Sequence, residues 1–147
     1  MPDSRAVEAF DPKVAARFIE SQDAQGGLPQ YLGVRFTAYE PGILRAQMPV
    51  REELLTFIGN MHGGVLSAVC DHVLGCVCYP HMQKGQWAAT TEFKINLLAP
   101  VSKGVLDVEA EIVSMTRATA VVQIRIENEG RSCCVAQGTV LIRDPKK

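Results

Sequence analysis

The sequence lacks an excess of charge of either sign. Its 147 residues include 15 lysines and arginines against 16 aspartates and glutamates, a formal net charge of -1, with no block of like charges. A protein that binds nucleic acid normally carries a basic patch, and a charged interaction tail carries a run of one sign. The charge distribution therefore gives no indication of a nucleic-acid partner.

Long apolar stretches and a targeting signal are also not evident. No window reaches the roughly 18 consecutive apolar residues of a membrane span. The first residues include Asp3, Arg5 and Glu8 and contain no apolar core of signal-peptide length. We therefore expect a soluble, cytoplasmic protein without a membrane partner.

The cysteines form no recognisable framework. There are five, an odd number, and the spacings Cys76-x-Cys78 and Cys133-Cys134 differ from the Cys-x-x-Cys of zinc knuckles. They lie in apolar runs, which is typical of reduced thiols in a protein core. We predict neither disulfides nor a metal site.

Size and the absence of repeats or low-complexity segments predict one domain, because a chain of about 150 residues can bury roughly 70% of its unfolded surface. Asp11 and Pro12 predict the N-cap and first residue of a short amphipathic helix that ends near residues 22–25, before Gly26 and Gly27. We expect residues 1-30 to be an N-terminal helical extension and residues 31-147 to be the main domain.

The main domain has a pattern of two strands, one helix and four strands. Alternating apolar residues predict a hairpin of residues 34–39 and 43–49 around Pro41 and Gly42, followed by a loop or irregular turn over 51–61. The apolar run 65–79 predicts the central helix, which Pro80 ends. Runs rich in β-branched residues predict four more strands, over 87–97, 105–114, 118–127 and 132–142. This order favours an α+β fold in which an antiparallel sheet of about six strands curls round the helix.

The start of the central helix is suited to binding an oxyanion. His62, Gly63 and Gly64 open the helix, where the first amides have no intrahelical acceptor and the dipole adds roughly half a positive charge. Glycine lets a substrate carbonyl approach the backbone, so the amide of Gly63 or Gly64 can polarise it during acyl transfer. The His62 side chain could equally cap the helix.

Asp71 is the one acidic residue in this apolar helix. A desolvated carboxylate can act as base or nucleophile, although a structural aspartate bonded to backbone or to a partner chain is the alternative. Nine residues separate His62 from Asp71, about 13 Å along a helix and half a turn apart. Two helices packed antiparallel across a two-fold axis would bring the glycine turn of one copy to the aspartate of the other, which predicts an obligate dimer.

The sequence resembles the hotdog-fold acyl-CoA thioesterases, in particular their phenylacetate-pathway (PaaI-like) branch. The resemblance covers about residues 32–142 and depends on three features: Ile58-Gly59-Asn60-Met61-His62-Gly63-Gly64, the acid nine residues after His62, and the strand 90–99 that ends at Pro100. It implies a hotdog fold, homodimers that often pair into homotetramers, and hydrolysis of acyl-CoA thioesters without a metal or organic cofactor.

The resemblance also implies roles for individual residues. Asp71 matches the acid that activates water or attacks the thioester, Gly63 the amide that polarises its carbonyl, and His62 a neighbour that shapes the pocket. Thr90 matches a hydroxyl that holds the attacking water, with Thr91 as the alternative because strand register is uncertain by one residue. Gly75 stands where another branch has a hydroxyl. Further substrate contacts are expected from Gly64, from Thr56, which replaces the usual asparagine or glutamine, and from Arg117 on coenzyme A phosphates.

Other assignments remain open. His72 and His81 are expected to be structural or on the surface, and Thr90 and Thr91 could simply be good strand formers. An apolar acyl pocket could be walled by Tyr31, Leu32, Leu54, Leu55 and Phe57. Two other functions stay possible: a hotdog hydratase or dehydratase, although its proline-rich histidine signature is missing, and a non-catalytic acyl-CoA-binding module, which the unusual Thr56 leaves open.

Overall fold

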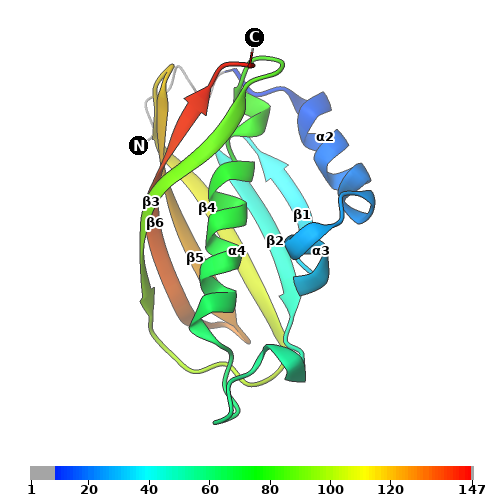
Figure 1. The fold of residues 1–147 in the computed structure, drawn as a ribbon, viewed down its shortest axis with the longest axis vertical. Coiled ribbons are helices and arrows are strands. Elements are labelled where there is room, and N and C mark those ends of the chain that lie inside the picture. The colour runs from blue at the N-terminus through cyan, green and yellow to red at the C-terminus, as the bar shows by residue number, and fades with distance from the viewer. Residues whose placement is uncertain (1–8, 147) are drawn as a thin grey trace.

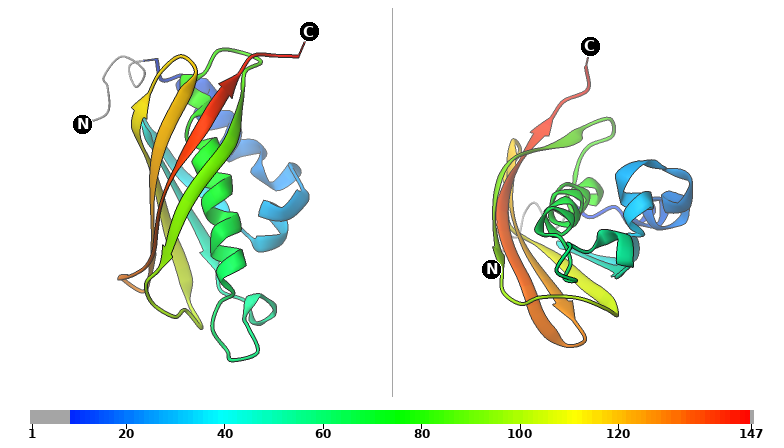
Figure 2. Two further views of the ribbon diagram at one scale, coloured as in Figure 1. Left: turned by 60° about the vertical axis from the view of Figure 1, so that its left-hand side comes forward. Right: turned by 60° about the horizontal axis from the view of Figure 1, so that its bottom comes forward.

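A six-stranded antiparallel sheet curls round one long helix, α4, in a computed structural model that describes residues 9–146 (Figure 1). Asp3, Arg5 and Glu8 lie outside the described residues. Viewed from the lower end of the molecule, α4 lies in the concave side of the sheet and the N-terminal helices lie beside it (Figure 2). The α+β architecture expected from the sequence is confirmed.

The strands follow the predicted pattern to within one residue at each end. Neighbouring strands in the sheet follow the order β1-β2-β4-β5-β6-β3, so the strand that follows α4 pairs with the last strand of the chain. Alternation of apolar and polar side chains sets which face each strand buries. The strands are β1 (Arg35–Glu40), β2 (Ile43–Pro49), β3 (Trp87–Leu97), β4 (Val105–Met115), β5 (Thr119–Asn128) and β6 (Arg131–Arg143).

Helix α4, Gly63–Cys76, buries one face against the sheet. That face consists of Leu66, Val69, Cys70, Val73 and Leu74. The helix lies close to the sheet at Gly138 of β6, where a Cβ would come within 2.5 Å of the Phe93 Cβ and 2.6 Å of the Leu74 Cδ1. Only glycine leaves room there for both the helix and the neighbouring strand.

The central helix ends three residues earlier than predicted. Its last residue is Cys76, and a separate 3₁₀ turn, Tyr79–His81, contains Pro80. Proline has no N–H to donate to the carbonyl four residues before it, which is that of Cys76. The Tyr39 hydroxyl donates to the Cys76 carbonyl instead, at 3.0 Å. A side chain from β1 therefore satisfies the carbonyl that Pro80 leaves unpaired.

The segment Gly63–His81 is long and apolar enough, by composition, to cross a membrane, with a mean hydropathy of 1.2 over its best window. Such a window was not expected from the sequence. In the structure this segment is α4 and the turn that follows it, and its apolar face packs against the sheet. Its hydropathy is that of a core helix.

The N-terminal region contains one more helix than predicted. Helix α2, Pro12–Ser21, has the expected N-cap, since the Asp11 carboxylate accepts a hydrogen bond from the Lys13 N–H at 2.9 Å. A short helix, α3, then spans Gly27–Leu32, which was not predicted from the sequence. The expected division of the chain at residue 30 falls inside α3.

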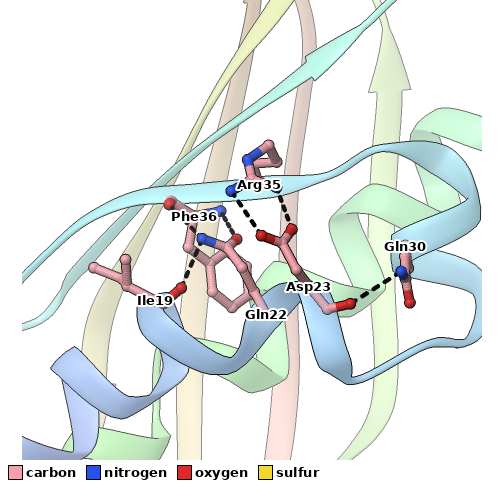
Figure 3. A network of polar contacts seen from close by, with 6 residues as sticks. All are labelled: Ile19, Gln22, Asp23, Gln30, Arg35 and Phe36. Carbon is pink, nitrogen blue, oxygen red and sulfur yellow. Dashed lines mark hydrogen bonds and ion pairs between the residues drawn. The ribbon is translucent and has the colours of Figure 1, made fainter.

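The two edges of the sheet differ. The β1 edge is covered: the Gln22 side chain donates to the Phe36 carbonyl at 3.2 Å and accepts from the Phe36 N–H at 2.7 Å, and Asp23 forms an ion pair with Arg35 (Figure 3). The opposite edge, β3, is 11 residues long and pairs with no other strand of residues 9–146 on its outer side. A long uncovered edge strand is a template for pairing with another chain.

Candidate active site

A groove of about 640 Å³ runs between α4 and β3. On the helix side it is lined by Asp71, His72, Gly75, Cys76 and Tyr79, and on the strand side by Ala88, Thr90, Thr91, Glu92 and Phe93. The structure therefore brings together Asp71 and the two threonines predicted from the sequence as candidate site residues. The groove opens along the uncovered edge of the sheet.

Asp71 lies on the face of α4 that its own sheet leaves uncovered. Gly64, Ala68, Asp71 and Gly75 are spaced four, three and four residues apart and form one stripe along this face. The desolvated carboxylate expected from the sequence is not found in the single protomer, because Asp71 is exposed. Within residues 9–146 no hydrogen bond or ion pair holds its carboxylate, so its own chain gives it no structural partner.

A β-bulge distinguishes the two threonines. The pairing of β3 with β6 shifts between Thr90 and Glu92, so Thr91 is the extra residue. Thr90 pairs with Val140 and shares the inner face with Ala88 and Phe93, whereas the Thr91 hydroxyl donates to the Thr139 carbonyl at 3.1 Å. The Thr90 hydroxyl has no hydrogen-bond partner among the described residues. Thr90 is thus the hydroxyl available to the groove.

The start of α4 presents one free amide. The His62 ring caps the helix, with its Nδ1 accepting from the Gly64 N–H at 2.8 Å. An accepting Nδ1 carries no proton, so the neutral ring holds its proton on Nε2. The Gly63 N–H, by contrast, has no acceptor within residues 9–146 and remains available to an oxyanion.

Thr56 has a role within its own loop. Its hydroxyl donates to the Asn60 side-chain oxygen at 3.1 Å, and its N–H donates to the Asn60 carbonyl at 2.7 Å. The hydroxyl proton is therefore already used in the protomer. Thr56 stabilises the turn that leads into His62.

The predicted site residues form two groups in one protomer. Asp71, Thr90 and Thr91 line the groove, whereas Gly63 lies at the other end of β3, where a Cβ on it would come within 2.7 Å of the Leu97 Cδ1. Arg117 is exposed in the turn between β4 and β5 and does not line the groove. One protomer therefore does not bring the free amide to the carboxylate.

On the helix side of the groove, three residues were not identified as site residues from the sequence. His72 stacks on Phe36, with ring centroids 5.2 Å apart, and its Nδ1 lies 3.7 Å from the Cys76 sulfur. Burial lowers the pKa of His72, opposed by the charge of Asp71. Burial, aided by the Asp71 charge, raises the pKa of Cys76 to about 12. The Cys76 thiol thus stays protonated at neutral pH.

Tyr79 is the third of these residues, and its hydroxyl accepts from the Ala88 N–H at 3.4 Å. The spacing of Asp71, Gly75 and Tyr79 by four residues each is the signal that could have placed them together. His81, in contrast, is buried and its Nε2 accepts from the Gly42 N–H at 3.0 Å, which confirms a structural role. No group of three His, Cys, Asp or Glu side chains between residues 9 and 146 is arranged to hold a metal ion.

Comparison with known proteins identifies the family. The model of the Thioesterase superfamily matches residues 58–135, which include α4, β3, β4, β5 and both groups of site residues. The chain belongs to the thioesterase superfamily. Among the relatives of this superfamily member, the proofreading thioesterase EntH of Klebsiella pneumoniae is 29% identical over 114 residues, covering 76% of this chain and 83% of its own. The 1,4-dihydroxy-2-naphthoyl-CoA hydrolase of Listeria monocytogenes is 24% identical over 122 residues, covering 82% and 99%.

Solved structures of the superfamily share the fold. A thioesterase from Haemophilus influenzae matches with a TM-score of 0.81 at 24% identity, covering 87% of this chain and 90% of its own. The Escherichia coli PaaI protein from the phenylacetic acid degradation operon matches with a TM-score of 0.82 at 20% identity, covering 91% and 96%. The hotdog fold expected from the sequence is confirmed.

Proposed function

We propose that the protein is an acyl-CoA thioesterase of the PaaI-like branch, which hydrolyses an acyl-CoA thioester to a free acid and coenzyme A in a composite site between two copies. The observation that carries the proposal is the groove that Asp71 and Thr90 line together. A carboxylate and an unpaired hydroxyl that line one groove can together hold and activate one water molecule. The names of the two thioester-hydrolysing relatives favour the same reaction class.

Pairing of two copies through β3 would complete the site. A two-fold axis that keeps both α4 helices on one face of a continuous sheet makes the two β3 strands antiparallel. The Leu97 end of one strand then lies beside the Ala88 end of the other. Because Gly63 packs against Leu97, its free N–H is carried toward the groove of the partner. The stripe of Gly64, Ala68 and Gly75 supports close packing of the two helices.

In this arrangement the chemistry is divided between the copies. The Gly63 N–H of one copy donates to the thioester oxygen and stabilises the negative charge that develops on it. Asp71 of the other either takes a proton from a water bound to Thr90, which attacks the carbonyl carbon, or attacks that carbon itself. The C–S bond then breaks and coenzyme A leaves as its thiol after protonation. When water attacks, the acyl group leaves directly as the acid; when Asp71 attacks, the acyl group stays on Asp71 as a mixed anhydride until a water molecule hydrolyses it to the acid and the free carboxylate. None of these steps requires a cofactor.

Replacing the Asp71 carboxylate with the neutral amide of asparagine tests the proposal. Asp71→Asn should lower turnover of acyl-CoA by about a hundredfold or more while leaving the fold intact, because the exposed carboxylate has no bond to its own chain. The control Asp107→Asn alters a carboxylate on the outer face of the sheet and should retain activity. Free thiol release should be measured with acetyl-, octanoyl- and benzoyl-CoA. Full turnover by Asp71→Asn, or a larger loss in Glu92→Gln, would contradict the assignment.

The same assay separates the alternatives. Water addition to crotonyl-CoA would favour a hydratase, and tight acyl-CoA binding without thiol release would favour a binding module. We further propose a homodimer that can pair into a homotetramer and acts on acyl-CoA in the cytoplasm. Light scattering after size-exclusion chromatography measures the assembly, and a monomer at assay concentration would contradict the composite site.

A further inference from the structure

The loop that leads into α4 is tightly held. Leu55 and Met61 form an isolated β-bridge, the Met61 N–H donates to the Val101 carbonyl at 2.6 Å, and the Gly59 N–H donates to the Thr56 carbonyl at 2.9 Å. Gly59 has a φ of 86°, a conformation that favours glycine. With the Thr56 to Asn60 bonds, these contacts fix the shape of the loop.

This ordered loop carries the two most exposed large apolar side chains among residues 9–146. Phe57 is fully exposed and Ile58 is 72% exposed. An isolated exposed apolar residue is ordinary, but two at the tip of a fixed loop form a surface suited to a partner. Of the other residues considered for an acyl pocket, Leu32 and Leu54 are in the core and Leu55 is half-buried. Tyr31 is exposed, but one face of its ring is covered by Arg51.

The direction of the two α4 helices determines where this loop tip lies in a dimer. If the two α4 helices run antiparallel, the residues that precede Gly63 in one copy continue toward the C-terminal end of α4 in the other. That end of the groove is lined by Gly75, Cys76, Tyr79 and Ala88. The wall there is made of small residues, and a Cβ on Gly75 would make only an ordinary van der Waals contact with the Ala88 Cβ, at 3.7 Å.

We propose that Phe57 of one copy closes the Tyr79 end of the partner's groove and sets the size of the apolar acyl group that fits there. The inference rests on the proposed function, because the acyl group is placed by the thioester at Asp71. A ring on the loop tip and the small residues Gly75 and Ala88 form opposite walls. The occupant between them is an aryl or medium-length alkyl chain.

Photo-crosslinking tests the placement without turnover. Phe57 is replaced by p-benzoylphenylalanine in the full chain, and the protein is irradiated and mapped by mass spectrometry. We expect covalent dimers joined to residues 71–79 or 88–93 of the other copy. The same replacement at Leu28, which is 56% exposed on α3, should give no such products. No crosslinked dimer from position 57, or crosslinks to other segments, would overturn the inference.

Substrate preference tests the effect on size. Phe57→Ala and Phe57→Trp should move the ratio of kcat/KM for octanoyl-CoA over acetyl-CoA in opposite directions, by about tenfold, with the larger ring favouring the short chain. Leu28→Ala should keep the wild-type ratio. Unchanged ratios in both Phe57 variants would overturn the inference. Crosslinking as expected without any acyl-CoA hydrolysis would refute the proposed function alone, whereas hydrolysis without the crosslink would refute this inference alone.

Discussion

Gly63 at the start of α4 packs against Leu97 at the end of β3, so closely that a Cβ would lie 2.7 Å from the Leu97 Cδ1. This contact fixes the free Gly63 amide at one end of the uncovered strand. Asp71 and Thr90 lie toward the other end, in the groove between α4 and β3. The separation of donor and carboxylate along one strand is the structural reason for proposing a site shared by two copies.

Removal of the Gly63 N–H should lower catalysis with little change in fold. Proline is tolerated at the first residue of a helix, and His62, with φ -63° and ψ 132°, already has the backbone conformation that proline requires before it. Gly63→Pro should therefore lower kcat on the order of a hundredfold, the effect of losing one oxyanion donor.

The matched control is Gly63→Ala, which adds the same Cβ against the flexible end of Leu97 but keeps the N–H. It should lose much less activity than the proline variant. Circular dichroism and thermal melting check that both variants fold. Equal losses in the two variants would show that the close packing, and not the amide, matters.

The bulge in β3 predicts different effects for two adjacent threonines. Thr90→Val removes the hydroxyl that faces the groove and should lower kcat/KM at least about tenfold, the loss of one hydrogen bond to a reacting group. Thr91→Val removes a bond to the Thr139 carbonyl and should cost at most about 1 kcal/mol of stability, with activity near that of wild type. Thiol-release kinetics and urea unfolding measure the two effects. The reverse pattern would mean that Thr91 faces the substrate.

Alanine substitutions at two glycines near the groove should change the stability of the protein in opposite directions. Gly138→Ala places a Cβ within 2.6 Å of the Glu92 carbonyl oxygen and the Leu74 Cδ1, and overpacking of this kind costs about 1–3 kcal/mol. Gly75→Ala meets only ordinary contacts and should stabilise α4 by up to about 1 kcal/mol. Urea unfolding measures both free energies. A neutral Gly138→Ala would show that α4 can move away from the sheet without cost.

The sequence was sufficient for the regular elements and insufficient for their ends and contacts. The strands and α4 were predictable because their apolar periodicity matches the face they bury. The early end of α4 was not, because it depends on a hydrogen bond from Tyr39, which is distant in sequence. Helix α3 was missed because Gly26, Gly27 and Pro29 are locally typical of a loop.

The candidate site was predictable as a set of residues but not as an arrangement. The spacing of His62 and Asp71 predicted a site made by two copies, and in the structure Gly63 and Asp71 lie apart in one protomer. Sequence alone did not decide between Thr90 and Thr91, because that choice depends on a bulge opposite β6. It also did not show that His62 uses the Gly64 amide and leaves that of Gly63 free.

Complementation between two inactive variants tests the shared site most directly. The two inactive variants, Asp71→Asn and Gly63→Pro, are mixed in equal amounts, unfolded and refolded together. A mixed dimer contains one site with both native groups, and half of the dimers are mixed, so activity should return to about one quarter of the wild-type value. No recovery in a mixture shown by mass spectrometry to contain mixed dimers would contradict the account.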